Sequence, residues 1–244
     1  DAWGGSIENR TRIHLEIIKK CREVVGSDFP ISIKLNSADF QKGGFSAEES
    51  IQVAKMFEQA GVDLLEISGG TYEQPKLIGA DNISINPDRS EVRKESTIAR
   101  EAYFLDYAAK IRAAVEMPLM VTGGFRTREG MEKALESGIC QVVGIGRPLC
   151  ADPHCMKKLF SGEIDSLPSF EKTLSLGPWI FSPNSPFTLI QAINAFGAMA
   201  WFYQQIKEMS AGRMPDLDKK LLQAFLAHTK ADKLAVQDYL NHQS

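Results

Sequence analysis

The sequence predicts an α/β protein built on a parallel β-sheet, and three observations support this prediction. Helical patterns and short strand-like segments alternate four times between residues 7 and 146. The strand-like segments are short apolar runs with β-branched residues, which is typical of strands buried on both faces. Two successive strands end in glycine clusters, TGGF and GIGRP. The alternation alone fits either a doubly wound sheet or a (β/α)8 barrel.

The first two repeats each consist of a helix followed by a strand. Residues 7–25 have a helical apolar pattern, and the strand ISIKL at 31–35 follows a turn segment that contains glycine and proline. Residues 47–60 also have helical spacing, Gly61 ends that helix, and the strand DLLEIS occupies 63–68. Turn residues therefore separate each predicted helix from the strand that follows it.

The next two repeats follow a longer insertion at residues 69–95. A helix is predicted at 97–115, and PLMVTGG at 118–124 is the third strand. A short helix at 127–137 begins at a capping threonine and ends before a glycine. The fourth strand, QVVGIG at 141–146, runs directly into an Arg-Pro pair.

Residues 166–244 predict a helical extension instead of further strands. A proline-broken loop leads into an apolar helix near 189–209, a linker at 212–215 and a more polar helix at 216–242. Aromatic residues in AWFYQQ recur at helical spacing, so we expect one face of the first helix to pack on the barrel. We therefore predict a barrel portion at 1–165 and a packed C-terminal loop and helical extension at 166–244.

Composition limits the classes of function. A chain of 244 residues with 43% hydrophobic content can bury a sizeable core. The net charge of −3 gives no basic field of the kind that nucleic acid binding requires, so we expect no nucleic acid partner. The longest apolar stretch is too short to span a bilayer, so no membrane association is expected. The four cysteines lack zinc-site spacing, which predicts reduced thiols, no metal and a cytoplasmic protein.

The strand ends favour the barrel. In a (β/α)8 barrel, functional groups lie at the carboxyl ends of the strands, and phosphate is often held after the last two strands. Glycines there let backbone N–H groups approach an anion closely, and Arg147 adds a charged donor. The dinucleotide fingerprint GxGxxG is absent after the first strand, which argues against a nicotinamide-binding doubly wound domain. We therefore predict a phosphate cradle, although glycines at these positions can also serve only to turn the chain.

Several motifs together resemble one family. In this order and spacing, the sequence contains DAWGGSIENRTR, IKLNSADF, GGFS, LEISGGTYE, STIAREAYFLDYA, PLMVTGGFRT and VVGIGRPL. This set resembles the Old Yellow Enzyme family of FMN-dependent NAD(P)H oxidoreductases and ene-reductases, over nearly the whole chain. The family fold is an FMN-binding (β/α)8 barrel, and the matching segments resemble its last four β/α units.

The resemblance implies where FMN is held. By the resemblance, the FMN phosphate is bound at the GGF and GR positions, which are Gly123, Gly124, Phe125, Gly146 and Arg147. FMN is expected to be bound non-covalently, with NAD(P)H as the hydride donor. The implied substrate is a small electrophilic alkene or a quinone-like molecule.

Lys34 occupies the position where many family members carry an arginine facing the N1–C2 carbonyl edge of the flavin. A cation there stabilises the negative charge that develops as flavin accepts hydride, although a lysine offers a point charge in place of a fork. A lone lysine in a strand can also extend to solvent. Glu66 lies in the next strand and is either a base or, as we favour, an ion-pair partner of Lys34.

Three other residues are weaker candidates. Tyr72 follows the second strand and could reach the site, but loop tyrosines are usually packed or hydrogen-bonded at the surface. His14 and His154 lack metal-ligand spacing, and we interpret both as ordinary structural residues.

The first segment, DAWGGSIENR, resembles an internal part of the family sequence. The substrate-binding His with a second His or Asn, and the proton-donating Tyr, belong to strands that the resemblance places upstream of Asp1. We therefore expect the catalytic residues upstream of Asp1, and this chain to be the C-terminal portion of a longer protein or the product of a truncated gene.

Alternatives to an FMN-dependent oxidoreductase remain open at this point. One is a truncated non-catalytic fragment or interaction module, and a weaker one is a barrel with other phosphate-ligand chemistry, such as an aldolase or isomerase. Four strands with helices on one side leave open sheet edges. Self-association through those edges is therefore a further expectation.

Overall fold

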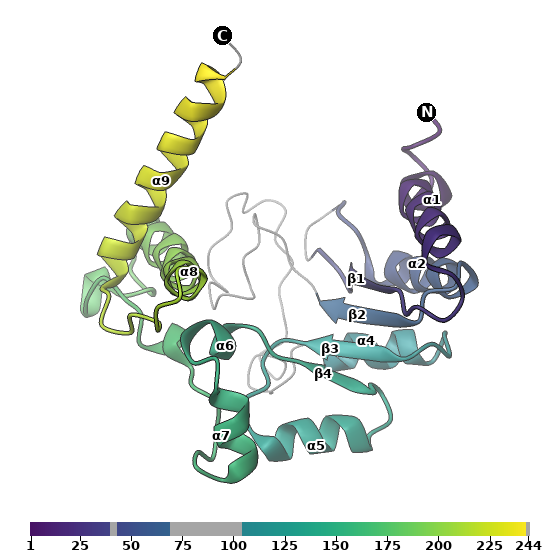
Figure 1. The fold of residues 1–244 in the computed structure, drawn as a ribbon, viewed down its shortest axis with the longest axis horizontal. Helices are drawn as coiled ribbons and strands as arrows, with labels where there is room; N and C mark the ends of the chain where they lie inside the picture. Colours follow the sequence, from purple (N-terminus) through teal and green to yellow (C-terminus); the bar gives the residue numbers. More distant parts are fainter. Residues whose placement is uncertain (40–42, 69–103, 243–244) are drawn as a thin grey trace. The chain divides into compact units, whose positions relative to one another are not determined.

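The computed structural model describes residues 1–39, 43–68 and 104–242, which are drawn in colour in Figure 1. The described residues fall into two compact units. The first unit contains those up to Ile145, and the second contains those from Gly146 onward.

The first unit is built on a four-stranded parallel sheet with the order β1-β2-β3-β4. Its strands are β1 (Ser32–Asn36), β2 (Leu64–Ser68), β3 (Leu119–Thr122) and β4 (Val142–Gly144). Each strand pairs in parallel with the next one along the chain. The predicted α/β fold with a parallel sheet is confirmed.

Helices alternate with these strands. They are α1 (Ile7–Val25), α2 (Ala47–Gln59), α4 (Leu105–Arg112) and α5 (Arg128–Glu136). Side-chain caps define where three of them begin: Ser6 precedes α1, Ser46 forms a capping box with Glu49 at α2, and Thr127 caps α5. The predicted helix at 97–115 is confirmed at 105–112, and its predicted start lies outside the described residues.

One face of the sheet forms the core of this unit. The alternating side chains Leu65, Ile67, Leu119 and Val121 are fully buried, and Phe57 of α2 is buried with them. Figure 1 shows the helices along one side of the sheet, and α4 packs on β3 while α5 packs on β4. Burying each large apolar side chain contributes roughly 1.5–3 kcal/mol. The period of two along the strands leaves the other face to a different set of residues.

The strand register defines which residues lie on the other face of the sheet. Lys34 lies opposite Glu66, Glu66 opposite Met120, and Met120 opposite Val142. These four residues form a row across the sheet on the face that does not carry the core. In a closed barrel of this type, the face away from the helices is the interior.

The second unit is helical. Its elements are α6 (Arg147–Ala151), α7 (Cys155–Ser161), the 3-10 turns η3 (Phe170–Lys172) and η4 (Trp179–Phe181), α8 (Thr188–Ser210) and α9 (Leu221–Asn241). Its core centres on Trp201, which packs with Ala151 of α6, Ala224 of α9 and its neighbours on α8. The Trp201 indole nitrogen donates a hydrogen bond of 2.9 Å to the carbonyl of Lys219.

The two long helices match their predictions to different degrees. The apolar helix predicted near 189–209 is observed at 188–210. The polar helix predicted to begin at residue 216 begins at Leu221 instead. The segment before it is held outside the helix because the Lys219 carbonyl accepts from Trp201 and the Lys219 ammonium faces Glu208 at 3.5 Å. No helix in the described part of the chain is both long and apolar enough to cross a lipid bilayer.

Candidate functional site

The carboxyl ends of the four strands place polar and small residues along one edge of the sheet. Asn36 of β1 lies opposite Ser68 of β2, and Thr122 of β3 lies opposite Gly144 of β4. The Ser68 hydroxyl donates to the Asn36 side-chain oxygen at 3.3 Å. In open or closed parallel sheets, ligands bind at this edge. The predicted site residues of the first unit all lie on or just beyond these strands.

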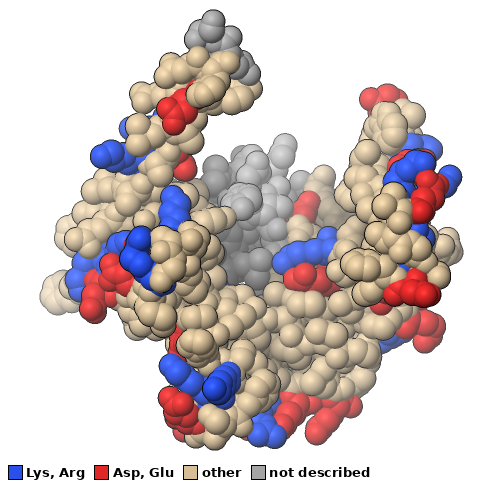
Figure 2. All heavy atoms as spheres, viewed as in Figure 1, with Lys and Arg blue, Asp and Glu red and all other residues tan. Residues whose placement is uncertain are grey.

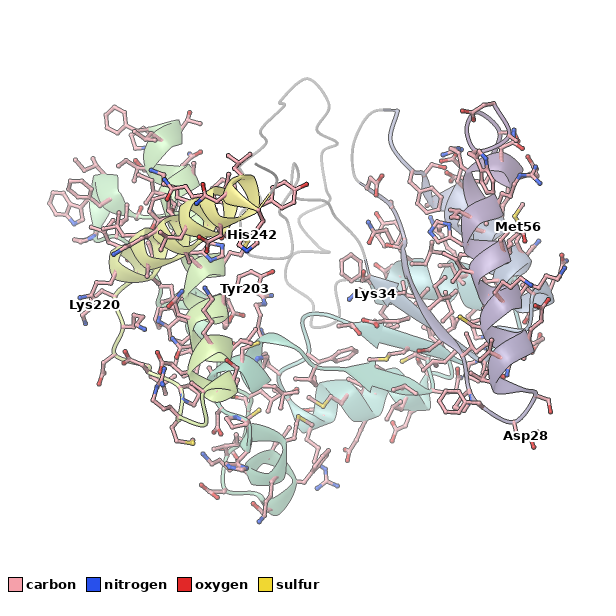
Figure 3. The ribbon with its side chains drawn as sticks, turned by 45° about the horizontal axis from the view of Figure 1, so that its top comes forward. Asp28, Lys34, Met56, Tyr203, Lys220 and His242 are labelled. Atoms are coloured by element: carbon pink, nitrogen blue, oxygen red, sulfur yellow. The ribbon has the colours of Figure 1, made fainter. Side chains whose placement is uncertain are left out.

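Lys34 and Glu66 form an ion pair, as the sequence interpretation favoured. The Lys34 ammonium lies 2.9 Å from the Glu66 carboxylate, and the two residues are direct neighbours in the β1–β2 register. The Lys34 side chain is 57% exposed and that of Glu66 is 22% exposed. Figure 3 shows Lys34 on the side of β1 that faces away from α1. The ammonium can therefore meet a ligand on that face while its carboxylate partner stays mostly covered.

Gly123 and Gly124 directly follow β3 and have backbone angles φ of 123° and 87°. L-amino acids with a side chain rarely adopt such angles, so both positions require glycine. The Phe125 side chain is buried. Its ring is therefore a core anchor, and Phe125 can reach a ligand only through its backbone. The first two positions beyond the strand therefore carry no side chain.

Gly146 and Arg147 lie at the start of the second unit, two and three residues beyond the end of β4. A Cβ atom built on Gly146 would meet nothing within 4 Å, so its surroundings are open. The Arg147 guanidinium lies 3.7 Å from the Glu171 carboxylate, and these side chains are 21% and 14% exposed. Arg147 therefore has a fixed, mostly covered position in its unit.

The structure adds residues that sequence reasoning missed. The hydroxyl oxygens of Ser37 and Thr122 are buried without a hydrogen-bond partner at the carboxyl ends of β1 and β3. Glu171 is the other missed residue, and nothing in its local sequence indicated that it faces Arg147. The signal for the two hydroxyls was present, since each polar residue stands at the end of an apolar strand.

The remaining candidates have ordinary structural surroundings or lie outside the described residues. His14 packs its ring 6.1 Å from the ring of Phe57, and the backbone N–H of His154 donates to Asp152 at the start of α7. Tyr72 lies outside the described residues. Within the described ranges, no three His, Cys, Asp or Glu side chains gather as they would around a metal ion.

Among the described residues, charge and thiol chemistry indicate no competing site. Figure 2 shows acidic and basic side chains intermixed on the visible face, without a large field of one sign. The four cysteines are free thiols. Burial raises the pKa of the Cys150 thiol, and the nearby Arg147 charge opposes this only in part. The same cause raises the pKa of the Cys140 and Cys155 thiols, so these three groups are not activated nucleophiles.

Comparison with known proteins decides the family. Residues 1–165 match the model of the NADH:flavin oxidoreductase / NADH oxidase family. The chain belongs to this family. The resemblance to Old Yellow Enzymes is therefore confirmed, and the cofactors of the flavin oxidoreductase family are FMN and NAD(P)H.

Individual relatives agree with this assignment. The chain is 36% identical over 162 residues to an NADH oxidase of Thermoanaerobacter brockii, covering 66% of this chain and 23% of that protein. It is 32% identical over 214 residues to an NADH-dependent flavin oxidoreductase of Talaromyces variabilis, covering 86% of this chain and 49% of that protein. The chain thus spans about a quarter to a half of the length of these curated relatives.

A solved structure of the same fold agrees with the described sheet. A 2-naphthoyl-CoA reductase, solved with 2-naphthoyl-CoA, is 32% identical with a TM-score of 0.55, over 68% of this chain and 24% of that protein. The parallel β/α units of this flavin oxidoreductase chain are therefore those of the family's (β/α)8 barrel.

The residues present fit FMN on grounds of their own chemistry. Two glycines with positive φ follow β3 without side chains of their own, and the surroundings of Gly146 after β4 are open. An ammonium and a guanidinium supply the positive charge that a phosphate and a reducible ring require. Each unit, taken by itself, therefore offers groups that suit an anionic cofactor, and among the described residues no arrangement favours a metal.

Proposed function

We propose that this protein acts in an FMN-dependent NAD(P)H oxidoreductase that reduces a small electrophilic alkene or a quinone-like molecule. The observation that carries the proposal is that one parallel sheet combines two positive-φ glycines after β3 with a cation on β1, within a chain of the flavin oxidoreductase family. Because the chain covers only part of its curated relatives, the activity, the substrate and a cytoplasmic location are proposals about the whole protein.

Each proposed site residue has a distinct task. FMN supplies the hydride-transfer chemistry when it is bound. Gly123, Gly124 and Phe125 offer backbone N–H groups to the phosphate, and Gly146 leaves room for it. Arg147 adds a charged donor that suits a phosphate better than a lysine would. Each of these groups suits the phosphate end of the cofactor.

Lys34 acts at the other end of the proposed site. With FMN bound, the Lys34 ammonium would supply positive charge to the ring, which would stabilise its reduced, more negative form. A point charge tolerates small shifts of the ring more readily than a bidentate guanidinium does. Lys34→Met should therefore weaken reduction of the cofactor more than its binding.

FMN retention by the purified 244-residue chain is the first test. Stoichiometric flavin that survives desalting, with a dissociation constant that rises about tenfold or more in Gly124→Ala, is the expected result, because alanine strains a backbone angle of 87°. Gly138→Ala is the matched control, since Gly138 has a φ of 71° at the end of α5, outside the proposed site. It should reduce stability but leave the dissociation constant unchanged.

Two other outcomes are informative. Retained FMN without turnover of NAD(P)H and an enone would support the alternative of a non-catalytic fragment or interaction module. Failure to bind any FMN would refute the proposed role of the glycines. Size-exclusion chromatography with light scattering on the same sample tests the proposed self-association through sheet edges, which predicts a mass above 27.0 kDa.

A further inference from the structure

The ion pair between Lys34 and Glu66 is the feature of the described sheet that the proposed function leaves unexplained. The proposed role of Lys34 needs only a cation on β1. The structure places a carboxylate directly beside it, at 2.9 Å and in register on the adjacent strand. The backbone pairing makes the two residues direct neighbours, so their side chains remain within reach of each other.

Glu66 has few other ways to satisfy its charge. Its two cross-strand neighbours in the register are Lys34 on one side and Met120 on the other. Met120 is apolar, and Lys34 is the ion-pair partner that the described residues provide. The Glu66 side chain is 22% exposed, so water covers only a small part of it. A carboxylate in these surroundings is held towards the ammonium.

We infer that Glu66 is a positioning residue that sets the charge presented to FMN by Lys34, and thereby lowers the reduction potential of the bound cofactor. This inference rests on the proposed function, because it requires FMN to lie near Lys34. An ammonium with an adjacent carboxylate presents much less positive potential than an isolated ammonium. Glu66 therefore holds the Lys34 head group in place and moderates how strongly it favours the reduced, more negative ring.

Glu66→Gln tests the inference because it keeps the size and polarity of the side chain and removes its charge. We expect the midpoint potential of bound FMN to rise, with the ratio of reduced to oxidised cofactor increasing about tenfold at a fixed ambient potential. For a two-electron couple that is about 30 mV. The affinity of the oxidised flavin for sulfite should also increase, because the sulfite adduct likewise places negative charge on the ring.

Two variants separate this role from a general effect of charge or packing. Glu66→Asp keeps the charge and should stay closer to the parent potential than Glu66→Gln does. Glu132→Gln removes a carboxylate from another ion pair, with Arg128 at 2.7 Å on α5, and should leave the potential unchanged. Thermal unfolding of all variants identifies any that are merely destabilised, and potentials are compared only for samples that retain FMN.

The outcomes distinguish the inference from the proposed function. If the parent chain binds no FMN, the proposed function fails, and the inference fails with it. If the parent binds FMN and Glu66→Gln leaves the potential and the sulfite affinity unchanged, or lowers them, the role of Glu66 is refuted while FMN binding stands. A rise that Glu132→Gln reproduces would also refute it.

Discussion

Gly144 should not tolerate a side chain, and the structure gives the reason atom by atom. A Cβ atom built there would lie 1.9 Å from the Thr122 hydroxyl oxygen, 2.8 Å from Thr122 Cβ and 2.7 Å from Met120 Cε. Rotating the Thr122 hydroxyl away leaves the contact with its Cβ, so a rotamer change cannot relieve the overlap. Gly144→Ala must therefore shift β4 against β3 or displace Met120.

The expected cost follows from two opposing effects. Overpacking a buried site by one methyl group costs typically about 1–3 kcal/mol. Replacing glycine with alanine recovers about 0.4–1 kcal/mol by restricting the unfolded chain. Gly144→Ala should thus lower the free energy of unfolding by about 1–2 kcal/mol, measured as a shift in the urea midpoint at constant slope.

Gly146→Ala is the matched control for this prediction. It lies two residues away, its φ is −119°, and a Cβ there meets no atom within 4 Å. Its free energy of unfolding should stay within about 0.5 kcal/mol of the parent. Combining Gly144→Ala with Thr122→Ala removes the contact at 1.9 Å but not the one at 2.8 Å, so recovery should be partial. Equal stabilities for Gly144→Ala and Gly146→Ala would refute the reasoning.

Two further predictions concern polar contacts, one of a buried amide and one of an exposed carboxylate. Asn194→Ala should lower the free energy of unfolding by about 3 kcal/mol, because the buried amide makes three hydrogen bonds to backbone groups that would lose their partner. Ser210→Ala, at the exposed end of the same helix, should lower it by less than about 0.5 kcal/mol. Equal losses for the two variants in urea unfolding would contradict this prediction. The Ile31 backbone N–H and then the Arg22 guanidinium lower the pKa of Asp63, so its stabilisation is present above the unfolded pKa and is lost as the pH falls below about 4. Between pH 5 and pH 2.5, the free energy of unfolding of Asp63→Asn should therefore fall less than that of the parent. If urea unfolding gives the same decrease for both proteins over this range, Asp63 does not contribute to the acid sensitivity.

Local sequence signals determined most of the secondary structure in the described residues. The apolar period of each strand and the capping residues Ser6, Ser46 and Thr127 depend on neighbours a few positions away, so they can be read from the chain. The two glycines after β3 belong to the same class, because their positive φ is a property of the backbone at that point. The motifs around them also indicated the family.

Local signals failed where distant contacts decide. The predicted polar helix starts later than expected because Trp201 takes the Lys219 carbonyl, a contact between residues 18 positions apart. Glu171 was missed as the neighbour of Arg147 for the same reason. The apolar periodicity of a sequence does not indicate which distant side chain will contact a given carbonyl or guanidinium group.

The sequence by itself thus determined the order of helices and strands, the glycine turns and the membership of the flavin oxidoreductase family. Only the tertiary structure decided the strand register, and with it the pairing of Lys34 with Glu66 and the lack of space at Gly144. The physical reason is that a strand's pattern fixes which face each side chain occupies, whereas a shift of two residues against its neighbour would preserve that pattern and change every contact. The charged surroundings of Lys34 are therefore set by the packing of β1 against β2.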